Sequence, residues 1–389
     1  SGEYEVTYKF TNKTDASDVI EVKQKVVVYA EGEPNEIVSV ESTLSIHPDW
    51  LTNVTVKLVQ PAGTLYYFLS TNETETAETV KTGSQVEVTS ETVVIEDLAI
   101  DDNTYIHILV VLNGETEVHS HELNRKPVQL ISTPEEFYQA VHSTKSDQQK
   151  YYYLLNADLD FTGFVWEEFV EKFYGIIDGN GHLISNLTMN VPKGIYGGIF
   201  EELDGATIKN IVFENINIIS EGERSGVISG RTSGSKVTVT NITIINSKVI
   251  VGDSSTLGSD MHGALIIGRV NGETEISNLK VVASEVMVYG KYVGGLVSYA
   301  EAKLDMSDLD VEIKVTEDSS SPQLVGGIVG RVGSSGVLTL NRVIAKVDLT
   351  GTKNIGGLLG KNDGTAYVYD ALITGKLYAS ASEESGAIS

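Results

Sequence analysis

The sequence predicts an all-β protein in which a two-layer β-sandwich precedes a right-handed parallel β-helix with about 30 residues per coil. Three observations predict it. Residues 1–127 contain short alternating strands separated by turn residues, residues 194–389 repeat a Gly-Gly-aliphatic step, and most repeats carry an Asn or Asp between apolar residues. We expect residues 128–193 to form a capping helix and the entry strands of the β-helix.

The sandwich is predicted from strands such as residues 54–59 and 105–111, with turn signals such as Asn113-Gly114 between them. Leu98 and Tyr105 bracket an acidic turn, and this stretch resembles the tyrosine corner of immunoglobulin-like and fibronectin type III sandwiches. We therefore expect residues 1–127 to be an immunoglobulin-like β-sandwich.

A short helix is predicted at the start of the junction. Thr133 and Glu136 form a capping box, with Pro134 at the first helical position. Three apolar residues follow at helical spacing: Phe137, Ala140 and Val141. The helix should end near His142 and cover the apolar end of the tube, which would otherwise expose unpaired strand edges. Two strands should enter the tube next, at residues 151–155 and 173–177.

The repeat has two landmarks. Its openings lie at residues 197–200, 225–228, 263–266, 294–297, 326–329 and 356–359, at steps of 28 to 37 residues. The second landmark is an Asn or Asp column, which we expect to stack as a ladder inside a turn. Its members are Asn210, Asn241, Asn278, Asp308 and Asp370, with Asn186 as an earlier copy. One coil departs, because Arg342 follows Asn341 where an apolar residue is expected. Residues 385–389 echo residues 225–229, so we expect the β-helix to continue beyond the last residue.

Composition excludes several classes of function. The formal net charge is −26, with 54 acidic and 28 basic residues, which argues against nucleic acid and anionic membrane surfaces as partners. No run of 18 apolar residues is present to enter a membrane. The chain has no cysteine, so a disulfide framework, a thiolate metal site and a cysteine nucleophile are excluded. This composition is typical of bacterial surface proteins.

The Gly-Gly-aliphatic step followed by the apolar-x-Asn strand resembles the GLUG repeats of bacterial surface proteins. Residues 173–182 and 184–187 are similar to the first-coil sequence that often precedes such repeats. The resemblance covers roughly residues 128–389. It implies a non-catalytic binding or spacer module at the bacterial cell surface, as in adhesin-like proteins. Its expected partners are a host glycoprotein or polysaccharide and further domains of the same polypeptide.

Five residues are the predicted binding residues. The longest coil step implies an inserted loop, and insertions on repeat scaffolds are common binding positions. This loop region contributes Asp253, Asp260 and His262. Tyr289 and Tyr292, with Tyr299 nearby, could stack on a glycan. A second group of tyrosines lies near the end of the chain, at Tyr367, Tyr369 and Tyr378.

No catalytic residue is predicted. The same repeats occur in the non-catalytic region of immunoglobulin A1 protease-type zinc metallopeptidases, so a substrate-recognition role there is the first alternative. The His-Glu-x-x-His zinc motif of such enzymes is absent. The second alternative is a carbohydrate-active β-helix enzyme, for which the best carboxylate cluster is Asp305, Asp308 and Asp310.

Two groups of residues are candidates for a metal site. Asp101 and Asp102 could hold Ca²⁺ at the edge of the sandwich, although a solvated turn explains them more simply. His119 and His121 lie on one face of a strand, where a half-exposed strand is again the simpler explanation. No other cofactor is expected.

Overall fold

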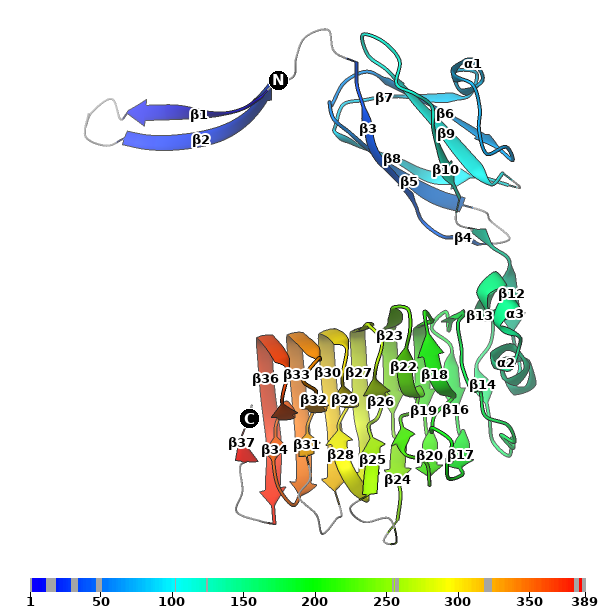
Figure 1. The fold of residues 1–389 in the computed structure, drawn as a ribbon, viewed down its shortest axis with the longest axis vertical. Coiled ribbons are helices and arrows are strands. Elements are labelled where there is room, and N and C mark those ends of the chain that lie inside the picture. The colour runs from blue at the N-terminus through cyan, green and yellow to red at the C-terminus, as the bar shows by residue number, and fades with distance from the viewer. Residues whose placement is uncertain are drawn as a thin grey trace. The chain divides into compact units, whose positions relative to one another are not determined.

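The computed structural model describes residues 2–11, 19–28, 34–46, 51–101, 103–123, 125–253, 255, 259–317, 324–380 and 385–386. The chain divides into two compact units, Ser1–Pro127 and Val128–Ser389. The predicted all-β class, a sandwich followed by a parallel β-helix, is confirmed (Figure 1). The described residues form three short helices: α1 (Ala77–Val80), α2 (Pro134–Val141) and α3 (Lys145–Lys150).

The sandwich consists of two antiparallel sheets, one of order β3-β5-β8 and one of order β10-β9-β6-β7. Their strands are β3 (Ile37–Ser42), β5 (Leu51–Leu58), β6 (Thr64–Ser70), β7 (Ser84–Glu87), β8 (Thr92–Ala99), β9 (Tyr105–Val111) and β10 (His119–Glu122). Alternation along β5 buries Val54 and Val56, whereas Asn53 and Lys57 on the other face are exposed. The buried face packs against Leu65, Ile106 and Ile108 of the other sheet.

The sandwich is shorter than predicted at its N-terminal side. Strands β1 (Gly2–Thr11) and β2 (Val19–Val28) pair with each other and form a separate two-stranded sheet. The first sandwich strand begins at Ile37. The local sequence pattern does not identify the partner of β2. Two further short strands, β4 (Ser45–Ile46) and β11 (Arg125–Lys126), pair in parallel.

Helix α2 begins as its capping box predicts. The Thr133 hydroxyl accepts a hydrogen bond from the Glu136 N–H at 3.2 Å, and the Glu136 carboxylate accepts one from Ser132 N–H at 2.6 Å. Phe137 points into the core, where its ring meets Phe161 edge-on at 6.0 Å. This core is continuous from Ile131 to Leu359, so α2 closes one end of the apolar interior.

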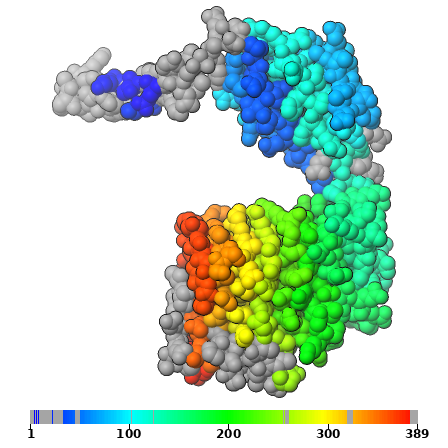
Figure 2. Space-filling view, viewed as in Figure 1, coloured from blue at the N-terminus to red at the C-terminus, as the bar shows by residue number. Residues whose placement is uncertain are grey.

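The β-helix is built of parallel strand pairs on three sheets. Sheet I has the order β18-β22-β26-β29-β32-β35, sheet II has the order β21-β25-β28-β31-β34-β37, and sheet III has 14 strands. In Figure 2 the successive coils form parallel bands from green to red. Sheet I contains β18 (Phe200–Asp204), β22 (Ser229–Ser233), β26 (Ile267–Val270), β29 (Val297–Ala300), β32 (Val329–Val332) and β35 (Leu359–Asn362). Sheet II contains β21 (Arg224–Ser225), β25 (Ser259–Gly263), β28 (Gly290–Gly294), β31 (Leu324–Gly326), β34 (Ile355–Gly356) and β37 (Ser385–Gly386).

The strands of sheet III become longer from the early coils to the later ones. In the early coils two strands per coil are separate, whereas the later coils have one bent strand of 15 residues. The strands are β12 (Val128–Ile131), β13 (Tyr152–Leu155), β14 (Leu159–Asp160), β15 (Ile176–Asp178), β16 (Leu183–Ser185), β17 (Thr188–Val191), β19 (Thr207–Glu214), β20 (Asn217–Ser220), β23 (Val237–Ile245), β24 (Lys248–Val251), β27 (Thr274–Val288), β30 (Lys303–Glu317), β33 (Val337–Gly351) and β36 (Thr365–Ala379). No helix among the residues that the structure describes is long and apolar enough to cross a membrane.

The register corrects two of the predicted openings. Ser225 pairs with Gly263, and Gly263 pairs with Val293, the residue before the glycine step of the next coil. The second and third opening steps therefore start one residue later than the sequence alignment places them, at residue 226 in the second and at residue 264 in the third. Ala264 takes the place of the first glycine there. A side chain at Gly263 would point toward Val251 in the core, as Val293 does in the next coil.

The Asn column stacks as a ladder. The Asn241 side-chain amide donates to Asn210 Oδ1 at 2.7 Å, and the Asn210 amide donates to Asp178 Oδ1 at 2.9 Å. The column residues have φ between 50° and 58°, the left-handed conformation that Asn tolerates better than most residues. They are Asn210, Asn241, Asn278, Asp308, Arg342 and Asp370.

One assignment to this column was wrong, and the register explains the one coil that departs from the pattern. Arg342, with φ 55°, holds the position expected for Asn341, and its guanidinium pairs with Asp308 at 2.6 and 2.7 Å. Asn186 belongs to a second ladder, in which it donates to Asp160 at 2.8 Å and accepts from Asn215 at 3.1 Å. The apolar-x-Asn pattern is the same at both corners, so sequence alone could not separate the two columns.

Asn210→Ala is expected to lower the free energy of unfolding by about 2 kcal/mol, because it removes two ladder hydrogen bonds and forces a Cβ-bearing residue without a polar side chain into the left-handed region. Asn210→Gly should lose only the hydrogen bonds, so its free energy of unfolding should be about 1 kcal/mol below that of wild type. Urea denaturation measures both. Equal losses for the two variants would contradict the backbone part of this argument.

Candidate functional site: an aromatic and cationic stripe

Two columns of side chains run along the outer surface where sheets I and II meet. The sheet II column contains Tyr196, Arg224, His262 and Tyr292 in register. The sheet I column contains Glu202, Arg231, Arg269, Tyr299, Arg331 and Lys361 in register. Neighbouring members of a column are about 4.8 Å apart, the spacing between paired strands.

Side chains of the two columns stack on one another in the central coils. The His262 ring lies 5.6 Å from Tyr299 at an interplanar angle of 21° and 4.7 Å from Tyr292. Tyr292 and Tyr299 are stacked at 5.5 Å. The Arg331 guanidinium lies 5.0 Å from the Tyr299 ring centre and donates to the Tyr292 hydroxyl at 3.1 Å. Sheets I and II therefore share one continuous surface here.

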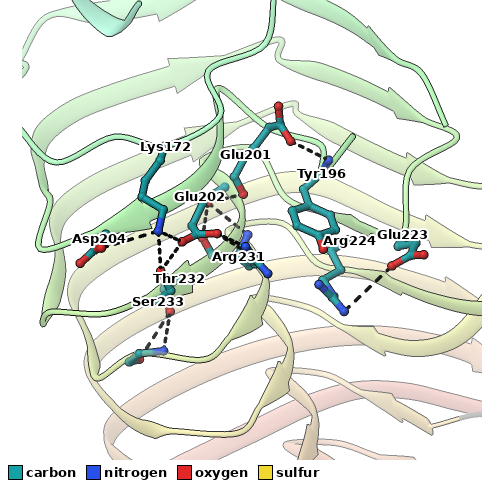
Figure 3. Close-up of polar contacts among 12 residues, drawn as sticks. Lys172, Tyr196, Glu201, Glu202, Asp204, Glu223, Arg224, Arg231, Thr232 and Ser233 are labelled. Carbon is teal, nitrogen blue, oxygen red and sulfur yellow. Dashed lines mark hydrogen bonds and ion pairs between the residues drawn. The ribbon is translucent and has the colours of Figure 1, made fainter. Parts of the chain in front are cut away.

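The stacking continues toward the earlier coils. Arg269 lies 4.9 Å from the Tyr299 ring centre. Arg224 and Arg231 each lie 4.8 Å from the centre of the Tyr196 ring (Figure 3). We call these eight residues the aromatic–cationic stripe: Tyr196, Arg224, Arg231, His262, Arg269, Tyr292, Tyr299 and Arg331. Such a surface offers ring faces and guanidinium donors side by side.

Three of the four stripe arginines have a close carboxylate partner. Arg231 pairs with Glu202, Arg269 pairs with Glu301, and Arg331 pairs with Asp363 at 2.7 Å. Arg224 differs: its nearest carboxylate in the described part of the chain is that of Glu223, at 4.0 Å (Figure 3).

Glu202 is the centre of a buried ion cluster beside the stripe. Its side chain is 4% exposed and accepts from Lys172 at 2.5 Å and from Arg231 and Ser233 (Figure 3). Burial by itself would raise the pKa of Glu202, but the hydrogen bonds from Lys172, Ser233 and Arg231 outweigh burial and lower the pKa. The hydrogen bond to Glu202 raises the pKa of Lys172.

His262 is buried in the stripe with a 1% exposed side chain. Burial lowers the pKa of His262, so the ring is neutral at pH 7. Neither ring nitrogen has a hydrogen-bond partner among the described residues. The distance from Nε2 to Asp260 Oδ2 is 3.8 Å, longer than a hydrogen bond.

A cavity of about 650 Å³ lies beside the sheet II end of the stripe. Its lining includes Asp253 and Asp260 of the predicted loop, together with Glu221, Glu223 and Lys193. Asp253 accepts hydrogen bonds from the Ser255 N–H at 2.7 Å and hydroxyl at 2.6 Å. This volume suits a small ligand, but four carboxylates make the lining acidic.

The predicted site residues thus fall into two neighbouring places. Asp253 and Asp260 line the cavity, and His262 and Tyr292 belong to the stripe with Tyr299. Tyr289 is half-buried just before β28. The remaining tyrosines are exposed on β36, 50% to 64%, at Tyr367, Tyr369 and Tyr378.

The other candidate positions belong to neither place. Asp101 is exposed in the turn after β8, and Asp102 lies outside the described residues. His121 Nε2 lies 3.0 Å from the Ser42 hydroxyl. Within the described ranges, no group of three or more His, Cys, Asp and Glu side chains is arranged to hold a metal ion. In the carboxylate cluster, Asp305 pairs with Lys303 at 2.9 Å and Asp308 pairs with Arg342.

Sequence reasoning missed most of the stripe. The missed residues are Tyr196, Arg224, Arg231, Arg269 and Arg331. A signal for them exists once the register is correct. Counted from residues 226, 264 and 294, which start the register-corrected openings, the position two residues earlier holds Arg224, His262 and Tyr292, while Tyr196 directly precedes the opening of the first coil. The position five residues after the start of the opening holds Arg231, Arg269, Tyr299, Arg331 and Lys361 in successive coils.

No family model matches the chain, so the resemblance to GLUG repeats stays a prediction. A stretch of 117 residues is 29% identical to Halomucin from Haloquadratum walsbyi (strain DSM 16790 / HBSQ001) and covers 28% of this chain. The match spans 1% of the length of that relative. The structure is also similar to that of a Bacteroides ovatus protein proposed to be an immunoglobulin A1 protease. That similarity has 18% sequence identity and a TM-score of 0.46, and covers 66% of this chain and 84% of the other.

Proposed function

We propose that this protein is a non-catalytic extracellular binding module of a cell-surface protein, adhesin-like, that presents the outer face of a rigid β-helix to a host glycoprotein or glycan. The observation that carries the proposal is the aromatic–cationic stripe. Tyr292 is partly exposed and offers ring surface, buried Tyr299 supports it from below by stacking, and Arg331 offers guanidinium donors next to them. Aromatic rings beside fixed polar donors are the usual means of holding a sugar.

The frame behind the stripe supports this role. Tyr299 is fixed by strand pairing on both sides, to Arg269 and to Arg331, and the stripe side chains hold one another by stacking and ion pairs. A binding surface fixed in this way loses little entropy when a ligand arrives. The acidic chain without cysteines, with net charge −26, suits a protein that works outside the cell.

Tyr292→Ala is expected to weaken glycan or glycoprotein binding by at least about tenfold, because the ring and its hydroxyl both leave the stripe. A glycan array with the intact chain identifies ligands, and surface plasmon resonance then measures the dissociation constant for the variant. Tyr369→Ala is the matched control, since Tyr369 is 53% exposed on sheet III, away from the stripe. It should bind like wild type.

Two results would count against the proposal. One is the absence of binding to every glycan and glycoprotein on the array. The other is the release of reducing or unsaturated ends when the chain is incubated with polysaccharides, which would make it a carbohydrate-active enzyme. Thermal melting of both tyrosine variants separates a loss of binding from a loss of fold.

A further inference from the structure

The geometry points to an anion subsite at Arg224, which takes the carboxylate or sulfate of an acidic oligosaccharide that lies along the stripe. This inference rests on the proposed function and names its ligand class. It begins with the charge of Arg224. The side chain is only 15% exposed, yet its nearest described carboxylate, that of Glu223, is 4.0 Å away and belongs to a side chain that is 63% exposed.

A guanidinium withdrawn from water needs hydrogen-bond acceptors to offset its lost hydration. The other three stripe arginines have close carboxylates, at Glu202, Glu301 and Asp363. Arg224 lacks one, and its Nε has no hydrogen-bond partner among the described residues. The position is therefore prepared for an acceptor from outside the chain.

The surroundings hold the Arg224 side chain in place. The Tyr196 ring holds the guanidinium by a cation–π contact at 4.8 Å (Figure 3). His262, the next residue in the column, is buried with both ring nitrogens unpaired. A neutral histidine there does not compete with an incoming anion for the guanidinium.

The column also sets the kind of molecule that fits. Arg224 and Tyr292 are two coils apart, which is about 9.6 Å at the spacing of paired strands. A sugar chain can place its acidic group on Arg224 and lay a ring against Tyr292 along the same line. A free inorganic anion would use only the first of these two positions.

Glu223 competes with this ligand for the Arg224 guanidinium. Its exposed carboxylate is the one negative group within 4.0 Å of the Arg224 guanidinium in the described chain. An incoming anion replaces it at the guanidinium, and the Glu223 side chain can turn toward the adjoining cavity that it lines. Removing the charge of Glu223 should therefore strengthen binding, whereas removing that of Arg224 should weaken it.

The test is an array that pairs neutral oligosaccharides with their sialylated, sulfated and uronic-acid counterparts, followed by titration calorimetry on the best pair. Wild type should bind the acidic member at least about tenfold more tightly than the neutral one. Arg224→Gln should remove that preference, and Glu223→Gln should raise affinity for the acidic member about two- to fivefold. Glu221→Gln, an acidic residue of the same cavity without a contact to Arg224, should change nothing.

Each other result overturns the inference in a distinguishable way. Equal binding of acidic and neutral members would refute the subsite and leave the proposed function intact. An acidic preference that survives Arg224→Gln would place the anion elsewhere. Inorganic sulfate bound as tightly as any acidic glycan would mark a free-anion site. No binding to any member would remove both the subsite and the proposed function.

Arg224→Lys keeps the positive charge but loses the forked donors of the guanidinium. It should therefore retain only part of the preference for the acidic oligosaccharide.

Discussion

Glu202→Gln should lower the free energy of unfolding by about 3 kcal/mol, because a buried carboxylate that neutralises two cations is replaced by a neutral amide. Lys172 and Arg231 would keep their charges beside the amide. Both are about one-third exposed, with side-chain exposures of 31% and 35%, so water compensates them in part. The expected loss therefore lies at the lower end of the range for a broken buried ion pair.

Loss of the Glu202 carboxylate should weaken more than one coil, because Lys172 lies on a different segment from its partners. Lys172 belongs to the segment between β14 and β15, whereas Glu202 lies on β18 and Arg231 on β22. The cluster joins these three segments near the capped end, as Figure 3 shows. Denaturation of Glu202→Gln, followed by circular dichroism in urea, measures the loss.

Glu201→Gln is the matched control, one residue earlier on the same strand. Its carboxylate accepts a long hydrogen bond of 3.4 Å from the Tyr196 N–H, which a glutamine oxygen can also accept. Burial raises the pKa of Glu201, so its charge is unfavourable in the folded state and its removal should not destabilise the protein. Equal losses for the two variants would show that the ion cluster contributes nothing.

The two glutamates also differ in the sign of their pH dependence. The folded-state pKa of Glu202 lies below its ordinary value of 4.5, so its stabilisation is fully present above pH 4.5 and is lost as the pH falls through the lowered pKa. Glu202→Gln should therefore lose less stability than wild type on acidification below pH 4.5. Wild type and variant with parallel acid profiles would contradict this assignment.

The fold class could be predicted because its signals are local. The glycine step and the apolar-x-Asn strand are each recognised from a few consecutive residues. Alternation of apolar and polar residues likewise identifies a strand without knowledge of its pairing partner. Register could not be predicted in the same way. Gly263 resembles a corner glycine in sequence, but it faces the core opposite Val293, while Ala264 holds the corner.

The same limit explains which site residues were found. Tyr292 and His262 were singled out as an aromatic residue and a residue of an insertion. Their stacking on Tyr299 depends on pairing between coils about 30 residues apart, which no local pattern contains. The stripe arginines belong to no sequence motif, because their role depends on the ring or carboxylate that lies beside them in the folded structure. Ligand binding at Asp253 and Asp260 stays a prediction.

Gly295→Ala is expected to cost about 3 kcal/mol or more of unfolding free energy, because the added Cβ would overlap a backbone atom of the next coil. The overlapped atom is the Gly327 carbonyl oxygen, and the carbonyl carbon would lie 2.9 Å away. A flexible side chain could move aside, but a backbone carbonyl can shift only if the stacked coils separate. Urea denaturation measures the cost, and failure to obtain soluble protein would be the same result at its extreme.

Gly181→Ala separates this overlap from the general cost of replacing a glycine. Gly181 has φ 82° and nothing within 4 Å of an added Cβ, so alanine there should cost only the strain of the left-handed region, about 1 kcal/mol. If both variants lost the same amount, close approach of the coils would not be the reason for the glycine at 295.

The hydrogen bonds explain why the earlier coils do without this glycine. Val227 and Leu265 occupy the corresponding position, and each bonds straight across: Val227 N–H donates to the Leu265 carbonyl at 2.8 Å. Gly295 N–H donates instead to the Gly326 carbonyl, one residue earlier in the next coil, at 2.9 Å. That shift coincides with the close approach of the Gly295 Cα to the neighbouring backbone. Leu265→Ala, at the straight-paired corner, should therefore cost only the lost packing of a buried side chain, about 2 to 3 kcal/mol, with the coils still stacked.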